Sequence, residues 1–176
     1  MLFTEYPLAM LPQVIVLLIV AAYTATGCVW DIKTRKLPNW LTVPTFALGL
    51  LFHTVVGGLG GLQFSLAGFA VGFGLLFVLM AVGGGGGGDV KFMGALGAWV
   101  GWKAILVIFI GSGLIAAISL LALLAWGLIS GKSAAKGGPE EAPSAARRLI
   151  PYALPATVSA WLVLGGMFTL KWIASS

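Results

Sequence analysis

Two aspartates, Asp31 and Asp89, are the side chains of this chain best suited to chemistry. The 176 residues include only five acidic side chains, and these two are the only aspartates. Asp89 closes a run of six glycines, 83–88, between two apolar segments. Because glycine has no Cβ, such a run lets the backbone leave one helix and direct the start of the next. An aspartate at that start is favoured by unpaired backbone N–H groups and by the helix dipole.

A close pair of carboxylates has a specific chemical use, which is the hydrolysis of an amide. One carboxylate takes a proton from water while the other gives a proton to the leaving nitrogen. Two like charges a few ångströms apart do not both ionise easily, so the pair would share one proton. The alternative for Asp89 is structural, because a glycine hinge with a capping aspartate explains the same spacing.

Composition indicates the setting in which these aspartates act. The chain is 60% hydrophobic and 9% charged, and its mean hydropathy is +1.06. Such a chain is an integral membrane protein, so we expect an all-α fold, a single domain over 1–176 and apolar helices of about 20 residues. The first apolar run lacks a basic segment before it and is expected to be retained. Cys28 is the single cysteine, which permits no intramolecular disulfide and no cysteine-based zinc site. No metal and no cofactor are expected.

The apolar runs predict six transmembrane helices. Their expected ranges are 10–29, 41–56, 62–82, 89–102, 104–129 and 149–170. The break between the fourth and fifth is placed at Trp102 and Lys103, which mark a membrane surface. The fourth helix would then be only about 21 Å long, so Asp89 would be recessed or the bilayer would be thinner there. Small residues predict close helix packing: Gly68, Gly72, Gly94, Gly97 and Gly101.

Positive charge predicts the orientation in the membrane. Eight of the ten cations lie in the loops 30–40, 83–91 and 130–148, which are therefore expected to be cytoplasmic. The net charge of +5 then reflects topology and gives no reason to expect nucleic-acid binding. Two crossings separate Asp31 from Asp89, so both carboxylates are expected at the cytoplasmic face, where they can meet.

Three other features have a plain interpretation. His53 is the only histidine, and a lone histidine in an apolar helix is more often a hydrogen-bonded packing residue, so no role is assigned to it. Lys33 and Lys91 either offset the repulsion between the aspartates or anchor at lipid headgroups, and anchoring is favoured. The segment 131–133 reads Gly-Lys-Ser, but Trp126 stands where a phosphate-binding loop needs glycine.

The motifs around the two aspartates resemble those of the prepilin peptidases. Asp31 is followed by a basic loop and Pro38-Asn39, and 86–89 reads Gly-Gly-Gly-Asp before Val90-Lys91. Prepilin peptidases are membrane aspartic proteases of the GxGD type that remove the leader from type IV pilin and pseudopilin precursors. The resemblance covers most of the chain and implies that Asp31 and Asp89 are the catalytic pair. The supporting residues that it implies are Gly86, Gly88, Lys91, Pro38 and Asn39.

The same resemblance implies a location and partners. The protein would lie in the bacterial inner membrane, with its active site facing the cytoplasm, and would act on a prepilin or pseudopilin precursor within the lipid bilayer. With one cysteine and no insertion before Asp31, the chain resembles the short peptidase-only type associated with Flp or Tad pili. N-methylation of the product is therefore not expected.

Two other classes of function account for the sequence less well. An ion- or proton-coupled transporter would use the two acids as a cation site, but it predicts acids near the midplane and an inverted repeat of the glycine break. A structural subunit would leave the two aspartates unexplained. The sequence leaves open which precursor is the substrate, the oligomeric state, and the role of the loop 130–148.

Overall fold

The computed structural model describes residues 10–34, 37–82, 86–129 and 153–175, and all of its regular structure is helical. The helices are α1 (Met10–Thr34), α2 (Asn39–Ala81), α3 (Gly87–Ile129) and α5 (Ala153–Ser175). No strand occurs among these residues, so the expected all-α fold is confirmed. The loop 130–148, with its Gly-Lys-Ser segment, lies outside the described residues, as do Arg35, Lys36 and the glycines 83–85.

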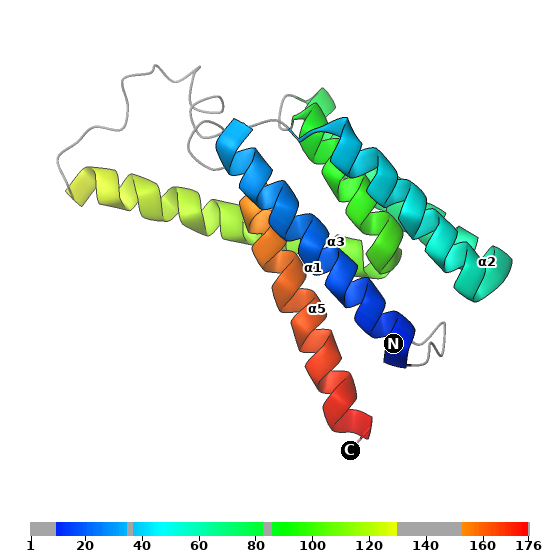
Figure 1. Ribbon diagram of the computed structural model, residues 1–176. Helices are drawn as coiled ribbons and strands as arrows, with labels where there is room; N and C mark the ends of the chain where they lie inside the picture. Colours follow the sequence, from blue (N-terminus) through cyan, green and yellow to red (C-terminus); the bar gives the residue numbers. More distant parts are fainter. Residues whose placement is uncertain (1–9, 35–36, 83–85, 130–152, 176) are drawn as a thin grey trace.

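Helix α2 folds back on itself at Gly58, where the backbone is non-helical with φ 60° and ψ −141°. Across the fold the rings of Phe46 and Phe69 lie 4.4 Å apart, and those of His53 and Phe64 lie 5.0 Å apart. These pairs are roughly equidistant from Gly58 along the chain, which is the signature of two antiparallel segments. The segments correspond to the expected helices 41–56 and 62–82 (Figure 1).

Helix α3 is interrupted at Gly101, which has φ 79° and ψ 169°. A positive φ favours glycine, and a Cβ at this position would also overlap the ring of Phe64. The interruption lies one residue before the expected break at Trp102. Lys103 places its ammonium 5.2 Å from the centre of the Trp102 ring. In Figure 1 the chain changes direction at this point and continues as the yellow-green part of α3.

The first segment of α3 packs against the second segment of α2 through glycines. A Cβ on Gly68 would overlap the carbonyl oxygen of Gly97, and a Cβ on Gly97 would overlap that of Gly68. Gly72 lies in the same way against the carbonyl oxygen of Met93. The two backbones therefore approach more closely than any larger residue would allow, as expected for small residues in membrane helices. Residues 92–100 are buried without exception.

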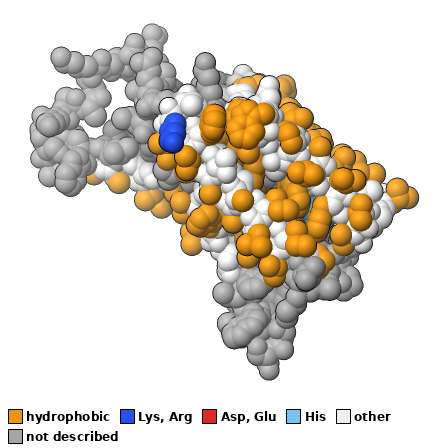
Figure 2. Space-filling model, in the orientation of Figure 1, with side chains coloured by type: hydrophobic (Ala, Val, Ile, Leu, Met, Phe, Trp, Pro, Cys, Tyr) orange, Lys and Arg blue, Asp and Glu red, His pale blue; other side chains and the backbone are white. Residues whose placement is uncertain are grey.

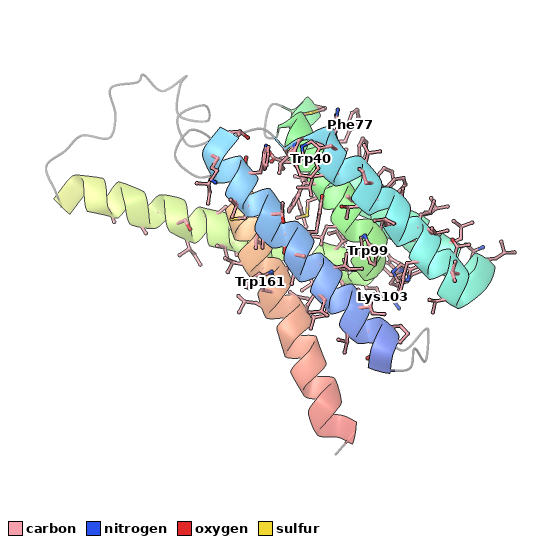
Figure 3. All side chains as sticks on the ribbon, in the orientation of Figure 1. Trp40, Phe77, Trp99, Lys103 and Trp161 are labelled. Atoms are coloured by element: carbon pink, nitrogen blue, oxygen red, sulfur yellow. The ribbon has the colours of Figure 1, made fainter. Side chains whose placement is uncertain are left out.

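Helix α5 is attached to α1 and α3 by polar side chains. Thr157 donates a hydrogen bond to the carbonyl oxygen of Thr24, and Trp161 Nε1 donates one to the hydroxyl of Thr24. Ser159 donates to the carbonyl oxygen of Ile108 in α3. Figures 1 and 3 show α5 running beside α1, with Trp161 near their contact. These bonds fix α5 to α1 close to the end that carries Asp31.

Three helices of the described part of the chain are long and apolar enough to cross a membrane: Pro12–Thr34, Asn39–Ala81 and Gly87–Ser119. The face in Figure 2 is mainly hydrophobic, and Lys or Arg side chains show at one place, toward the upper end of α1. Exposed residues include Leu18, Leu51 and Leu59. An apolar surface of this extent is suited to lipid. The exact number of crossings stays a prediction.

Candidate active site

Helices α1 and α3 meet through Tyr23, Gly27 and Phe92. The hydroxyl of Tyr23 donates a 3.1 Å hydrogen bond to the carbonyl oxygen of Phe92, and their rings stack with centroids 4.8 Å apart. Gly27, one turn further along α1, lies directly under the Phe92 ring, because a Cβ there would overlap it. These contacts set the axial position of α1 relative to α3.

Asp31 lies one turn beyond Gly27 and shares its helix face, since residues four apart are neighbours on a helix. Its side chain is buried, with an exposed fraction of 6%. The sequence placed Asp31 in a loop after Trp30, but α1 remains helical to Thr34. Asp31 is therefore held by a helix rather than by a loop, which restricts where its carboxylate can lie.

Asp89 lies in the first turn of α3, as the sequence predicted. Its Oδ2 accepts a 3.2 Å hydrogen bond from the backbone N–H of Gly86. In return, the carbonyl oxygen of Gly86 accepts from the N–H groups of Asp89 and Val90, at 3.1 and 3.3 Å. The bond from the Gly86 N–H to the Asp89 carboxylate is one half of a capping box, with the aspartate three residues after the cap. Gly86 has no side chain for the other half, and its backbone carbonyl oxygen takes that place. The bond from the Gly86 N–H orients the carboxylate and stabilises its negative charge.

The other predicted site residues join the starts of α2 and α3. A Cβ on Gly88 would lie 3.3 Å from Cβ of Leu37, so this glycine leaves just enough room for the loop before α2. Pro38 is extended, with φ −77° and ψ 145°, and caps α2 through its carbonyl oxygen. Lys91 Nζ donates a 2.9 Å hydrogen bond to Oδ1 of Asn39. The structure therefore brings the two motifs to the same end of the molecule.

The register of α1 and α3 also relates the two aspartates. In Figure 1 the first segment of α3 runs in the opposite direction to α1, and Gly27 lies against the ring of Phe92. Asp31 follows Gly27 by four residues, and Asp89 precedes Phe92 by three, so each lies about one turn from this contact in the same direction. Each aspartate also shares a helix face with its contact residue. From this register we expect Asp31 and Asp89 to lie at the same level of the two helices.

Tyr23 and Gly27 were not identified from the sequence as residues of the site. Their signal is the spacing of 23, 27 and 31, which marks one stripe along α1. The rings of Trp30 and Trp40 contact each other edge to face, with centroids 5.4 Å apart. Among the described residues, no cluster of three or more His, Cys, Asp or Glu side chains could hold a metal ion.

The sequence of this chain is similar to those of known proteins. Residues 14–121, which include both aspartates, match the Type IV leader peptidase family. Three relatives are each named Prepilin leader peptidase/N-methyltransferase. The Neisseria gonorrhoeae protein is 39% identical over 111 residues, covering 57% of this chain and 38% of the relative. The Pectobacterium carotovorum subsp. carotovorum protein is 31% identical over 159 residues, covering 86% and 49%. The Escherichia coli (strain K12) protein is 34% identical over 95 residues, covering 50% and 42%.

The chain spans less than half the length of these relatives. No solved structure matches it. The family match covers more than half of the chain, however, and extends from near the start of α1 into the second segment of α3. On this basis the chain belongs to the type IV leader peptidase family.

Proposed function

We propose that this protein is a membrane aspartic endopeptidase that removes the leader peptide from type IV prepilins or related precursors. Family membership supports the reaction class. The observation that supports the catalytic assignment best is the contact of Gly27 and Tyr23 with Phe92. From this contact we infer that Asp31 and Asp89 lie at one level of the two helices. A water molecule between two such carboxylates can be activated on one side while the substrate is protonated on the other.

The hydrogen bonds of the two aspartates suggest different roles for them. The Gly86 N–H and the N-terminus of α3 both stabilise a negative charge on Asp89. Asp89 is therefore the carboxylate that takes a proton from the attacking water. Asp31 gives a proton to the leaving amide nitrogen as the C–N bond breaks. The proton taken by Asp89 then restores the shared proton of the pair, so that the enzyme is ready for another cycle.

Lys91 and Asn39 act on this site indirectly. Their hydrogen bond joins the second residue after Asp89 to the first residue of α2. Because Gly88 also contacts Leu37, two contacts hold the start of α3 against the segment that leads into α2. The function of Lys91 is thus to keep the first turn of α3 in place, in addition to any contact with lipid headgroups. Pro38 and Asn39 form the start of α2, on the other side of these contacts.

The cut site of the precursor is proposed to lie at the cytoplasmic face of the bacterial inner membrane. The support is the distribution of cations in the sequence, since Lys33, Arg35 and Lys36 follow Asp31 and Lys91 follows Asp89. In a precursor with a short basic leader before an apolar helix, the junction between leader and helix would lie at the cytoplasmic face of the membrane. The basic leader would be attracted by anionic lipid rather than by the cationic loop of this protein.

The proposal is tested with purified protein in detergent and a candidate prepilin, by following the mobility shift that loss of a leader produces. Asp31→Asn and Asp89→Asn should each abolish cleavage, because an amide cannot hold the shared proton or act as a base. Thr26→Ala is the matched control on α1, since the Thr26 hydroxyl is exposed and bonds only to its own helix at Ala22. Substantial cleavage by either Asn variant would remove that aspartate from the mechanism. The transporter would be favoured instead if the unchanged protein cleaves no precursor but conducts cations in liposomes, and if both Asn variants lose that cation flux.

A further inference from the structure

The helical segment that carries Asp89 ends inside the molecule. Its last helical residue is 100, because Gly101 has non-helical backbone angles. The final four carbonyl groups of a helix have no partner within that helix. Within a bilayer no water is available to replace those partners, so neighbouring groups must supply them.

Two side chains of α2 supply hydrogen bonds at this end. Ser65 Oγ donates to the carbonyl oxygen of Ala98 at 2.9 Å. His53 Nε2 lies 3.1 Å from the carbonyl oxygen of Trp99. Because a carbonyl oxygen only accepts, Nε2 must carry the hydrogen. Both side chains are buried, with exposed fractions of 0% for Ser65 and 5% for His53.

His53 is held in this position by aromatic rings. Its ring centre lies 5.4 Å from that of Phe52, 5.0 Å from that of Phe64 and 6.2 Å from that of Trp99. Trp99 is bound to α2 a second time, because its Nε1 donates a 2.8 Å hydrogen bond to the carbonyl oxygen of Thr45. Figure 3 shows Trp99 on the side of α3 that faces α2. Both segments of α2 therefore hold this end of the helix.

We propose that His53 and Ser65 are positioning residues for Asp89, a role that rests on the proposed function. The competing arrangement is a straight α3, in which helical angles at Gly101 let Trp102 and Lys103 satisfy the same two carbonyls. The bonds from His53 and Ser65 favour the bent form instead. In that form Gly101 packs under the Phe64 ring and the Gly68 and Gly97 backbones touch. Asp89 lies ten residues from Trp99 on the same buried helix, about 15 Å along its axis, so a shift of one end moves the other.

The test measures the distance between the two carboxylate positions without using catalysis. Asp31→Cys and Asp89→Cys are combined in a Cys28→Ala background, and the rate of oxidant-induced cross-linking is followed in detergent. His53→Gln keeps an N–H donor at the reach of Nε2, whereas His53→Met has the same length and no donor. Cross-linking should be about three- to tenfold slower with His53→Met than with His53→Gln. Ser65→Ala should also slow the cross-linking, so the proposal can be tested even if His53→Met does not fold.

A second readout uses the native aspartates. His53→Met and Ser65→Ala should lower kcat per folded enzyme while KM changes little, because the dyad is misplaced and precursor binding is not. His53→Gln should restore kcat. Thr54→Val is the matched control, since the Thr54 hydroxyl bonds only to its own helix at Leu50.

The outcomes separate the two proposals. If the parent with both cysteines cross-links at the same rate as its His53→Gln, His53→Met and Ser65→Ala variants, that result would overturn the positioning role and leave the proposed dyad intact. A parent that never cross-links would overturn the facing dyad and the positioning role together. If total activity falls only in proportion to the folded fraction, and kcat per folded enzyme is unchanged, these residues stabilise the fold without positioning Asp89.

Discussion

The hydroxyl of Tyr23 donates a 3.1 Å hydrogen bond to the carbonyl oxygen of Phe92. This bond joins the helix of Asp31 to the helix of Asp89, and the stacked rings of the same two residues lie beside it. Phe92 is completely buried, and Tyr23 is only 4% exposed. The contact is therefore a buried link between the two helices, and we expect it to set the spacing of the proposed dyad.

Removing this hydrogen bond should affect activity more than stability. Tyr23→Phe keeps the stacked rings and leaves no buried donor without a partner, so we expect a loss of about 0.5–1.5 kcal/mol in stability. We expect kcat to fall by about three- to tenfold, because α1 can then slide against α3. Cleavage kinetics and thermal unfolding in the same detergent measure the two effects. A kcat equal to that of the unchanged protein would mean that ring packing alone sets the register.

A side chain at Gly27 should separate the two helices. A Cβ there would overlap the Phe92 ring, and overpacking of a buried contact costs about 1–3 kcal/mol. We expect Gly27→Val to lower cleavage by about a hundredfold, since a displacement of about 1 Å has such an effect on positioned groups. Gly74→Val is the comparison, because a Cβ at Gly74 meets nothing within 4 Å. Similar activity in the two variants would mean that close approach at Gly27 is not required.

Parts of this arrangement could be predicted from the sequence, and their physical reasons are local. Glycine and charge marked the start of α3 at Asp89 and the break near Gly101, because both depend on backbone freedom and on the cost of charge in a membrane. The helical end of α1 was missed. Trp30 marks the level of the interface, but a helix can continue past that level into the headgroups.

The partners of His53 and Ser65 could not be predicted from the sequence. Both bonds join residues more than 30 positions apart, Ser65 to Ala98 and His53 to Trp99. They exist because α2 folds back at Gly58 and lies against α3. The sequence correctly favoured a hydrogen-bonded packing residue for His53, but nothing local identified the carbonyl that it bonds. The pairing of Lys91 with Asn39 is of the same kind, and headgroup anchoring alone had been favoured for that lysine.

The bond between Lys91 and Asn39 can be measured by a double-mutant cycle. We expect Lys91→Met and Asn39→Leu each to lower cleavage several-fold, with the double variant no worse than the poorer single one. The coupling should be about 0.5–1 kcal/mol, since the pair is exposed. If Lys91 serves only as a headgroup anchor, Asn39→Leu will leave activity unchanged. Lys91→Arg will then be as active as the parent.

The orientation of the helices predicts opposite accessibility for the two ends of the first segment of α2. Thr34 lies just before it, at the end with Asp31, and Leu59 follows the fold at Gly58 and is 79% exposed. In a Cys28→Ala background, Thr34→Cys should react with an impermeant thiol reagent from the cytoplasmic side. Leu59→Cys should react from the other side, because residues 39–57 span about 28 Å as a helix. Labelling of both from one side would mean that this segment does not cross the membrane.

Membrane presentation should determine which precursors are cleaved. Asp31 is buried at the end of an apolar helix, and a soluble peptide has no means of being held beside it. A precursor that keeps its apolar helix is concentrated in the same bilayer, and its cut site is fixed at one depth, which supplies the positioning that hydrolysis requires. We therefore expect cleavage of a full-length precursor in liposomes to exceed that of a version lacking the apolar helix by about a hundredfold. Comparing the two precursors in detergent, at equal molar concentration, removes the shared bilayer. A difference that persists there comes from direct contact between the enzyme and the apolar helix of the precursor. Equal cleavage of both precursors in both settings would mean that the active site recognises the leader junction alone, and that the aspartates are reached from water.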